Sequence, residues 1–151
     1  MLKLSKKMLF AIEAVLDIAY HASDLPVQNS EITRRQDIPR RYLEQALQQL
    51  VHQGILIGVR GPRGGYRLAR ERRRISVGDI VRVVHHMEAK DGTNLDVWLS
   101  ELGTRVVRPM WMKLQANILQ ELDKISIDEL CDNAAKINII SEGKTNMDFS
   151  I

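Results

Sequence analysis

Cysteine and long apolar runs are nearly missing from this sequence. Cys131 is alone among 151 residues, which excludes an internal disulfide, and the four histidines do not cluster as the ligands of a zinc site would. No apolar run approaches the ~20 residues that a membrane-spanning helix needs. The first ten residues carry positive charge but have neither the apolar core nor the cleavage site of a signal peptide. We therefore expect a soluble protein of the reducing cytoplasm that does not contact a membrane.

A complete nucleotide-binding motif is also missing. Residues 58–69 read GVRGPRGGYRLA, whereas a phosphate-binding loop needs Gly, four spacers, Gly, Lys and Ser or Thr at the start of a helix. Here the glycines lead into YRLAR, which favours a strand, and a dinucleotide-binding fingerprint fails for the same reason. No nucleophile and base stand in a recognisable setting. The sequence predicts that the protein is not an enzyme and has no catalytic residue.

Charge is divided unevenly along the chain. Residues 1–84 hold 15 basic and 8 acidic residues, a formal charge of +7, whereas residues 85–151 hold 7 basic and 11 acidic residues, a formal charge of −4. The first half is therefore the candidate for contact with a polyanion.

Apolar residues at helical spacing predict three helices in the first 54 residues. The first begins behind Ser5, which can cap it, and the second is short, with Asn29 or Ser30 as its expected cap. The third is DIPRRYLEQALQQLVHQG, where Asp37 can cap the first turn and Gly54 ends the helix.

The pattern then changes to that of a hairpin. ILIGVR and GYRLAR are β-prone runs on either side of a turn in which we expect Gly64 and Gly65 to have positive φ. A fourth helix, SVGDIVRVV, follows with Ser76 and Asp79 in the spacing of a capping box. The order of three helices, hairpin and helix is that of a winged helix-turn-helix. We therefore predict a mainly α fold with a small β-hairpin wing and a long dimerisation helix.

The long helix follows an expected loop over residues 85–95. Apolar residues step by three or four from Leu95 to Ile125, and a small domain cannot cover so long a stripe, so we expect a second copy of the chain to cover it. Pro109 should bend or break this helix. The expected dimer contacts are Leu99, Leu102, Val106, Met110, Leu114, Ile118 and Leu122.

These patterns divide the chain into three parts. We expect a winged helix-turn-helix domain at residues 1–84, and a loop and long dimerisation helix with a short C-terminal helix at residues 85–134. A poorly ordered tail is expected at residues 135–151.

The polar face of the expected third helix carries residue types that can recognise bases. Arg matches guanine, Gln matches adenine and Glu accepts from cytosine, while Arg34 and Arg35 on the preceding helix are placed for phosphates. Arg60, Arg63 and Arg67 would project charge from the hairpin. Any one of these residues alone is more simply a solvated surface side chain, but the cluster favours duplex DNA. The expected DNA contacts are Ser5, Lys6, Arg34, Arg40, Arg41, Tyr42, Glu44, Gln45, Gln48, Arg60, Gly61, Pro62, Arg63 and Gly64.

The segments FAIEAVLDIAYHA, YLEQALQQLVHQGILIGVRGPRGGYRLA and ISVGDIVRVV resemble the Rrf2 family of bacterial winged helix-turn-helix transcriptional regulators, over a region that reaches about Ala134. The resemblance implies a homodimer held by the long helix, with each recognition helix in a major groove and each wing at a minor groove. It also implies base contacts from Tyr42, Glu44 and Gln45, and a minor-groove contact from Arg60.

The chain departs from the family members that carry an iron–sulfur cluster. Those members have three cysteines in the loop before the long helix, whereas residues 85–105 here contain none. His85 and His86 are adjacent and do not easily face one metal, and nothing basic flanks Cys131 in the sequence to make it a reactive thiolate. We therefore expect no cofactor and no metal, and a repressor controlled by a metabolite or a partner protein.

The alternative is a winged helix that binds a protein or RNA without operator specificity. Competition with duplex DNA separates the two hypotheses, because the alternative predicts only nonspecific electrostatic binding to a duplex.

The missing cysteines predict that the purified protein is colourless, even when it is prepared without oxygen. Three thiolates cannot come from one cysteine, and thiolates are the usual cluster ligands. A visible absorption spectrum and iron and sulfide assays of an anaerobic preparation test this. A brown preparation with stoichiometric iron and sulfide would contradict it.

Overall fold

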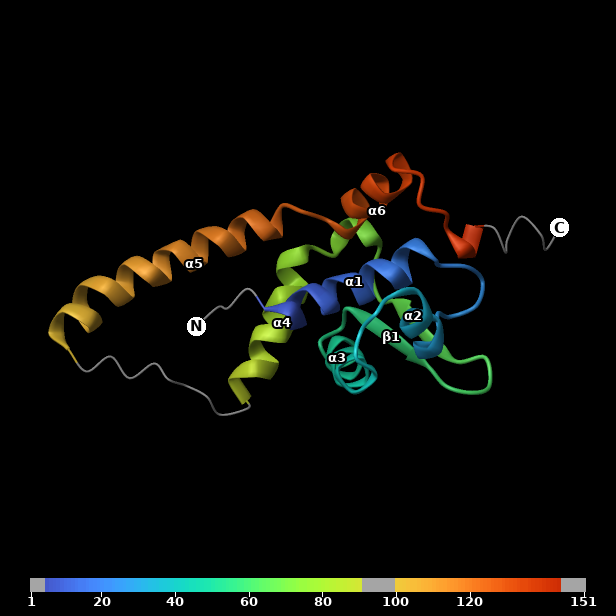
Figure 1. Ribbon diagram of the computed structural model, residues 1–151, viewed down its shortest axis with the longest axis horizontal. Helices are drawn as coiled ribbons and strands as arrows, with labels where there is room; N and C mark the ends of the chain where they lie inside the picture. The colour runs from blue at the N-terminus through green and yellow to red at the C-terminus, as the bar shows by residue number, and fades with distance from the viewer. Residues whose placement is uncertain (1–4, 91–99, 145–151) are drawn as a thin grey trace.

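The computed structural model describes residues 5–90 and 100–144 and shows a mainly helical chain with one two-stranded antiparallel sheet, as predicted. None of the helices described there is both long enough and apolar enough to span a membrane. The elements, labelled in Figure 1, are α1 (Lys6–Tyr20), α2 (Asn29–Arg35), α3 (Arg40–His52), β1 (Leu56–Val59), β2 (Gly65–Leu68), the 3₁₀ turn η1 (Arg72–Arg74), α4 (Val77–Lys90), the π turn η2 (Gly103–Val107), α5 (Arg108–Asp123) and α6 (Ile127–Lys136).

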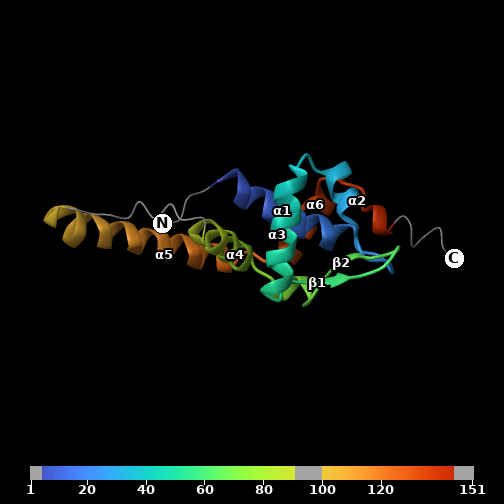
Figure 2. The same cartoon turned by 90° about the horizontal axis from the view of Figure 1, so that it is seen from below.

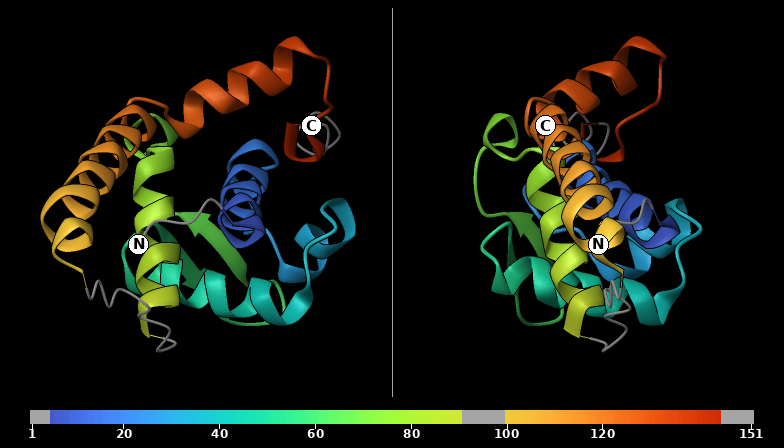
Figure 3. Two further views of the ribbon diagram at one scale, coloured as in Figure 1. Left: turned by 60° about the vertical axis from the view of Figure 1, so that its left-hand side comes forward. Right: turned by 90° about the vertical axis from the view of Figure 1, so that its left-hand side faces the viewer.

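Helix α1 is the centre of the packing. Ser5 caps it, because the Ser5 hydroxyl accepts a hydrogen bond from the Met8 N–H at 3.4 Å. Its buried face includes Ala11, Ala14 and Val15, whose small side chains allow close contact with neighbouring elements. Helices α3, α4 and α6 and strand β2 all pack against it, and α4 lies between α1 and α5 (Figure 3).

Helices α2 and α3 form the helix-turn-helix, with Ile32, Leu43 and Leu47 buried between them and α1. The N-cap residues of both helices differ from the predicted ones. The N-cap of α2 is Gln28, whose N–H donates to the Glu31 carboxylate at 2.8 Å, and the N-cap of α3 is Pro39 rather than Asp37.

A buried ion pair joins α1 to α2. The Arg35 guanidinium donates to both carboxylate oxygens of Asp17, at 2.8 and 2.9 Å, and Gln36 Nε2 donates to the same carboxylate at 3.0 Å. The Asp17 side chain is fully buried and that of Arg35 is 9% exposed. The expectation that Arg35 contacts phosphate is therefore wrong, because its guanidinium is inside the fold.

The hairpin pairs Leu56 with Leu68 and Val59 with Gly65. The backbone φ is positive at Gly65 (158°), as predicted. The other positive φ of the turn is at Gly61 (111°), whereas the prediction had placed it at Gly64. Gly64 is needed for a different reason: a Cβ atom there would lie 2.3 Å from the Val59 carbonyl oxygen across the turn. Val27 forms an isolated antiparallel bridge with β2, because its backbone exchanges hydrogen bonds with Tyr66 at 3.0 and 2.8 Å.

Helix α4 begins as predicted and ends later. The Ser76 hydroxyl accepts from the Asp79 N–H and the Asp79 carboxylate accepts from the Ser76 N–H, both at 3.0 Å, which confirms the capping box. The helix continues to Lys90, so the loop expected from His85 is wrong for residues 85–90. The first turn-forming pair, Asp91-Gly92, comes only after that point, and the rest of the expected loop lies outside the described residues.

Pro109 does not divide the long helix into two segments. Helical backbone runs from Glu101 through η2 to Asp123, and Pro109 lies in the first turn of α5. In a regular helix the ring of Pro109 would collide with the Arg105 carbonyl. The π turn before it, in which the Arg108 N–H donates to the Gly103 carbonyl, widens the backbone there.

The C-terminal part of the described chain differs from the expected poorly ordered tail. Helix α6 runs to Lys136, and the chain then returns to the end of α1. The Ser141 hydroxyl donates to the Tyr20 carbonyl at 2.7 Å, and the Tyr20 hydroxyl donates to the Ile139 carbonyl. Residues 135–144 are thus held by tertiary contacts, while residues 145–151 lie outside the described part of the chain.

The Asp17–Arg35 pair predicts a large loss of stability in Asp17→Ala. The change leaves the Arg35 cation buried without its main partner, so the free energy of unfolding should fall by about 3 to 5 kcal/mol. Glu121→Ala is the control, because Glu121 pairs with Lys124 at the surface and should cost less than about 1 kcal/mol. Denaturant titrations at one protein concentration measure both, and equal losses would contradict the role assigned to Asp17.

Candidate nucleic-acid interface

Helix α3 presents its polar face to solvent. Leu43, Ala46, Leu47 and Leu50 turn inward, so the opposite face is free for a partner. That exposed face carries five of the predicted base-reading residues: Arg40, Arg41, Glu44, Gln45 and Gln48. Arg40 Nε donates to Glu44 Oε1 at 3.2 Å, but the two side chains are 81% and 50% exposed. An ion pair this open contributes little, so both side chains stay available to another partner.

Tyr42 is placed differently from its neighbours on α3. Its hydroxyl donates to the Lys7 carbonyl at 2.6 Å, and its ring lies 6.1 Å from that of Phe10. Burial, with the nearby Glu88 carboxylate, raises the pKa of Tyr42 to about 12, so the phenol is neutral at physiological pH. Its hydrogen is already donated inside the fold, which ties the start of α3 to the start of α1.

That tie brings the predicted contacts at the start of α1 beside α3. Lys6 and Lys7 are exposed, and Lys7 Nζ lies 6.0 Å from the centre of the Tyr42 ring. Ser5 has structural partners of its own, since its hydroxyl donates to Glu88 Oε1 at 3.1 Å as well as capping α1. Lys7 was not among the expected contacts, although it stands next to Lys6 in the sequence.

The hairpin turn extends beyond the helices (Figure 2) and exposes Arg60 and Arg63. Gln28 Nε2 donates to the Pro62 carbonyl at 3.4 Å, which connects the turn to the start of α2. Arg67 does not project charge from the hairpin as expected. Its guanidinium donates to the Ser23 carbonyl at 3.2 Å and to the Asp24 carbonyl, so it fastens β2 to the chain after α1.

Arg34 lies at the junction of α2 and α3. It is exposed, and together with Arg40 and Glu44 it lines a cavity of about 560 Å³ between the two helices. Both Nη atoms of Arg34 donate to the Glu142 carboxylate, at 3.0 and 2.7 Å. Arg34 was expected to contact phosphate, and this partner was not foreseen, because no local pattern connects residues that are 108 positions apart.

The predicted dimer contacts lie on an uncovered apolar face. Leu102, Val106, Met110, Leu114 and Ile118 are 41–73% exposed along η2 and α5. Leu122 is half-buried and packs against the core, and Leu99 lies outside the described residues. Figure 1 shows α5 projecting away from the body formed by α1, α3 and the hairpin, so within the described chain only the inner side of α5 is in contact with α4.

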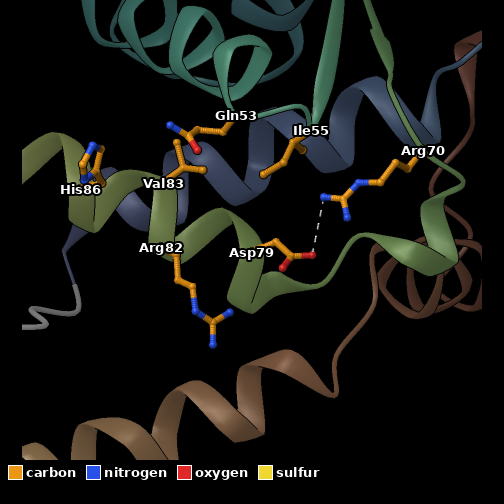
Figure 4. Close-up of a pocket in the computed structure, with 7 residues that line it drawn as sticks. All are labelled: Gln53, Ile55, Arg70, Asp79, Arg82, Val83 and His86. Carbon is orange, nitrogen blue, oxygen red and sulfur yellow. Dashed lines mark ion pairs between the residues drawn. The ribbon is translucent and has the colours of Figure 1, made fainter.

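A second cavity, of about 330 Å³, lies between the base of the hairpin and α4 (Figure 4). Arg70 lies 3.8 Å from Asp79 across it, and Asp79 also caps α4. Arg82 points away toward α5, where it binds Asp123 at 2.5 and 2.7 Å. The charged groups of this cavity are therefore matched within the protein.

The residues present do not fit an iron–sulfur cluster. The chain has one cysteine, and Cys131 is buried in α6. Burial raises the pKa of the Cys131 thiol, although Arg72 lies close enough to oppose that shift, a basic neighbour that the sequence did not reveal. Within residues 5–90 and 100–144, no three His, Cys, Asp or Glu side chains gather as metal ligands would.

The sequence profile of the Rrf2 family, described as iron-dependent transcriptional regulator, matches residues 4–133. The chain is 33% identical over 147 residues to the HTH-type transcriptional regulator IscR of Pectobacterium atrosepticum, an alignment that covers 96% of this chain and 88% of that protein.

Two solved structures extend the likeness to three dimensions. The structure of T. potens IscR superposes with a TM-score of 0.70 at 34% identity and covers 93% of each chain. That of CymR, the global cysteine regulator of B. subtilis, gives a TM-score of 0.66 at 26% identity, over 88% of this chain and 98% of CymR. Both relatives are regulators rather than enzymes, and the winged-helix fold is shared.

Proposed function

This chain belongs to the Rrf2 family of transcriptional regulators, and we propose that it binds a pseudo-palindromic duplex DNA site as a homodimer and represses transcription there. The observation that carries the proposal is the arrangement of α3. Its apolar face is buried and its Arg, Glu and Gln side chains are exposed, beside a basic hairpin turn and the basic start of α1. This arrangement fits a recognition helix in a major groove with flanking phosphate contacts.

The contacts divide by kind. Gln45 and Arg41, on the exposed start of α3, are assigned to base edges, because amide and guanidinium groups match adenine and guanine. Arg60 and Arg63, on the hairpin turn, are assigned to a minor groove. Arg34 and Lys6 are assigned to phosphates, which position the protein without reading sequence.

The exposed face of η2 and α5 supports the homodimer. A row of five large apolar side chains on a projecting helix is unusual for a monomer, and a second α5 would remove it from water. Dimerisation would also set two recognition helices at a fixed separation, which matches two half-sites related by symmetry.

The proposed regulator acts on chromosomal DNA, and we therefore assign it to the cytoplasm. Because no cysteine set for a cluster is present, we propose that its activity is controlled without one, by a metabolite or a partner protein. Control by a metabolite or a partner protein stays a prediction that rests on the family resemblance.

Two experiments test the function. Sequencing the genomic fragments that the purified protein enriches should give one palindromic motif, and an unlabelled duplex of that motif should compete far better than a scrambled duplex. If both duplexes compete equally at every salt concentration, the protein instead uses its basic face for a protein or RNA partner.

The assigned DNA contacts predict two different mutant signatures. Gln45→Ala should cost about 1 to 3 kcal/mol on the cognate duplex and little on a scrambled one, because a base contact is lost. Arg60→Ala should lower affinity and discrimination mainly where an A·T-rich minor groove is read. Titrations of each variant against both duplexes measure these losses of affinity. Equal losses on both duplexes for Gln45→Ala would show that α3 does not read bases in the major groove.

The exposed face of α5 predicts that Leu114→Glu gives monomers. A charge at the centre of an apolar interface would be buried without a partner, so the variant should dissociate and bind the operator much more weakly. Gln120→Glu is the matched control, since it adds the same charge to α5 outside the apolar row. Sedimentation at micromolar concentration distinguishes the two, and a dimeric Leu114→Glu protein would place the interface elsewhere.

A further inference from the structure

Residues 139–144 form a segment, here named the clasp, that docks on the end of α1. Besides the contacts of Tyr20 with Ile139 and Ser141, the Glu142 N–H donates to His21 Nδ1 at 3.0 Å. Burial lowers the pKa of His21, so the imidazole is neutral and can accept this hydrogen bond at neutral pH.

Gly143 shows how closely the clasp fits. A Cβ atom at this position would lie 2.2 Å from the Ala22 carbonyl oxygen and 2.3 Å from that of His21. Both are backbone atoms at the end of α1 and cannot move aside easily. The clasp therefore packs against α1 by shape as well as by hydrogen bonds.

Docking of the clasp delivers the Glu142 carboxylate to α2. Oε1 and Oε2 accept from the two Nη atoms of Arg34, and Oε2 also accepts from Arg35 Nη1. The hydrogen bond from Arg34, opposed by partial burial and reinforced by Arg35, lowers the pKa of Glu142 to about 2. The carboxylate is therefore ionised throughout the physiological range.

Arg34 faces the surface that carries the recognition helix, because it shares the cavity between α2 and α3 with Arg40 and Glu44. A two-pronged contact with a guanidinium is the geometry that both carboxylates and phosphates adopt. A carboxylate that occupies both Nη atoms of Arg34 leaves that edge unavailable to a phosphate.

We propose that Glu142 is an intramolecular competitor of the DNA backbone, which holds Arg34 in the free protein and must release it before Arg34 contacts a phosphate. The inference rests on the proposed DNA-binding function. Release of Glu142 also breaks its hydrogen bond from Arg35 Nη1, but Arg35 keeps both hydrogen bonds to Asp17, so α2 stays in place. The clasp thus lowers affinity for all duplexes alike, because phosphate contacts carry no sequence information.

The test is Glu142→Gln in the full chain, titrated against cognate and scrambled duplexes. An exposed ion pair is a modest competitor, so affinity should rise about two- to fivefold on both duplexes with their ratio unchanged. Asp132→Asn is the control, because Asp132 is an exposed acidic residue on α6 and is not the residue that pairs with Arg34. It should change affinity by much less.

Arg34→Ala then separates competition from simple charge repulsion. In the Arg34→Ala background, Glu142→Gln should give no gain, whereas repulsion between Glu142 and DNA would give the same gain as before. Gly143→Ala, which displaces the clasp without changing charge, should raise affinity like Glu142→Gln. Weaker binding by Glu142→Gln, no change, or an undiminished gain without Arg34 would each overturn the proposal.

A readout independent of affinity distinguishes failure of this proposal from failure of the function. Amide hydrogen exchange should show the Glu142 N–H protected in the free protein and less protected when cognate DNA is bound. If the cognate duplex binds specifically but this protection is unchanged, the clasp proposal fails and the function stands. If no duplex binds specifically, the function itself fails.

Discussion

The buried ion pair between Asp17 and Arg35 is the constraint on which the arrangement of the proposed DNA-binding surface depends. It joins α1 to α2 through two hydrogen bonds with the Asp17 side chain fully buried. Successive side chains on a helix point roughly 100° apart, so an inward Arg35 turns Arg34 outward toward α3. One fixed guanidinium thereby determines which of two adjacent arginines can meet a partner.

Three side-chain hydrogen-bond contacts connect the other elements of this surface. The Tyr42 hydroxyl ties the start of α3 to Lys7, Gln28 ties the start of α2 to the hairpin turn, and Arg67 ties β2 to the chain after α1. The sequence suggested a DNA contact for Tyr42 and a projecting charge for Arg67, and it gave no role to Gln28. In the folded protein Tyr42 and Arg67 hydrogen-bond to other parts of the chain, whereas Lys6, Arg41 and Arg60 are exposed.

Ion pairs also connect the acidic second half of the chain to the basic first half. Arg82 on α4 pairs with Asp123, Arg72 on η1 pairs with Asp128, and Arg34 on α2 pairs with Glu142. The first pair joins the long helix α5 to α4, and the second joins α6 to η1. The third lies beside α3, the proposed recognition helix, and for that reason we propose that this ion pair affects DNA binding.

Local patterns in the sequence determined the helices, the hairpin and the polar face of α3, because helical periodicity, capping spacing and turn glycines act over a few residues. The Ser76–Asp79 box and the inward Leu43 and Leu47 were predictable on those grounds. Only the tertiary structure decided between Arg34 and Arg35, accommodated Pro109 with a π turn and brought Glu142 to α2. The roles of Arg34, Arg35 and Glu142 depend on contacts between residues far apart in the chain, and an isolated charge carries no periodic signal of its partner. The π turn is local, but the apolar pattern around Pro109 does not reveal it.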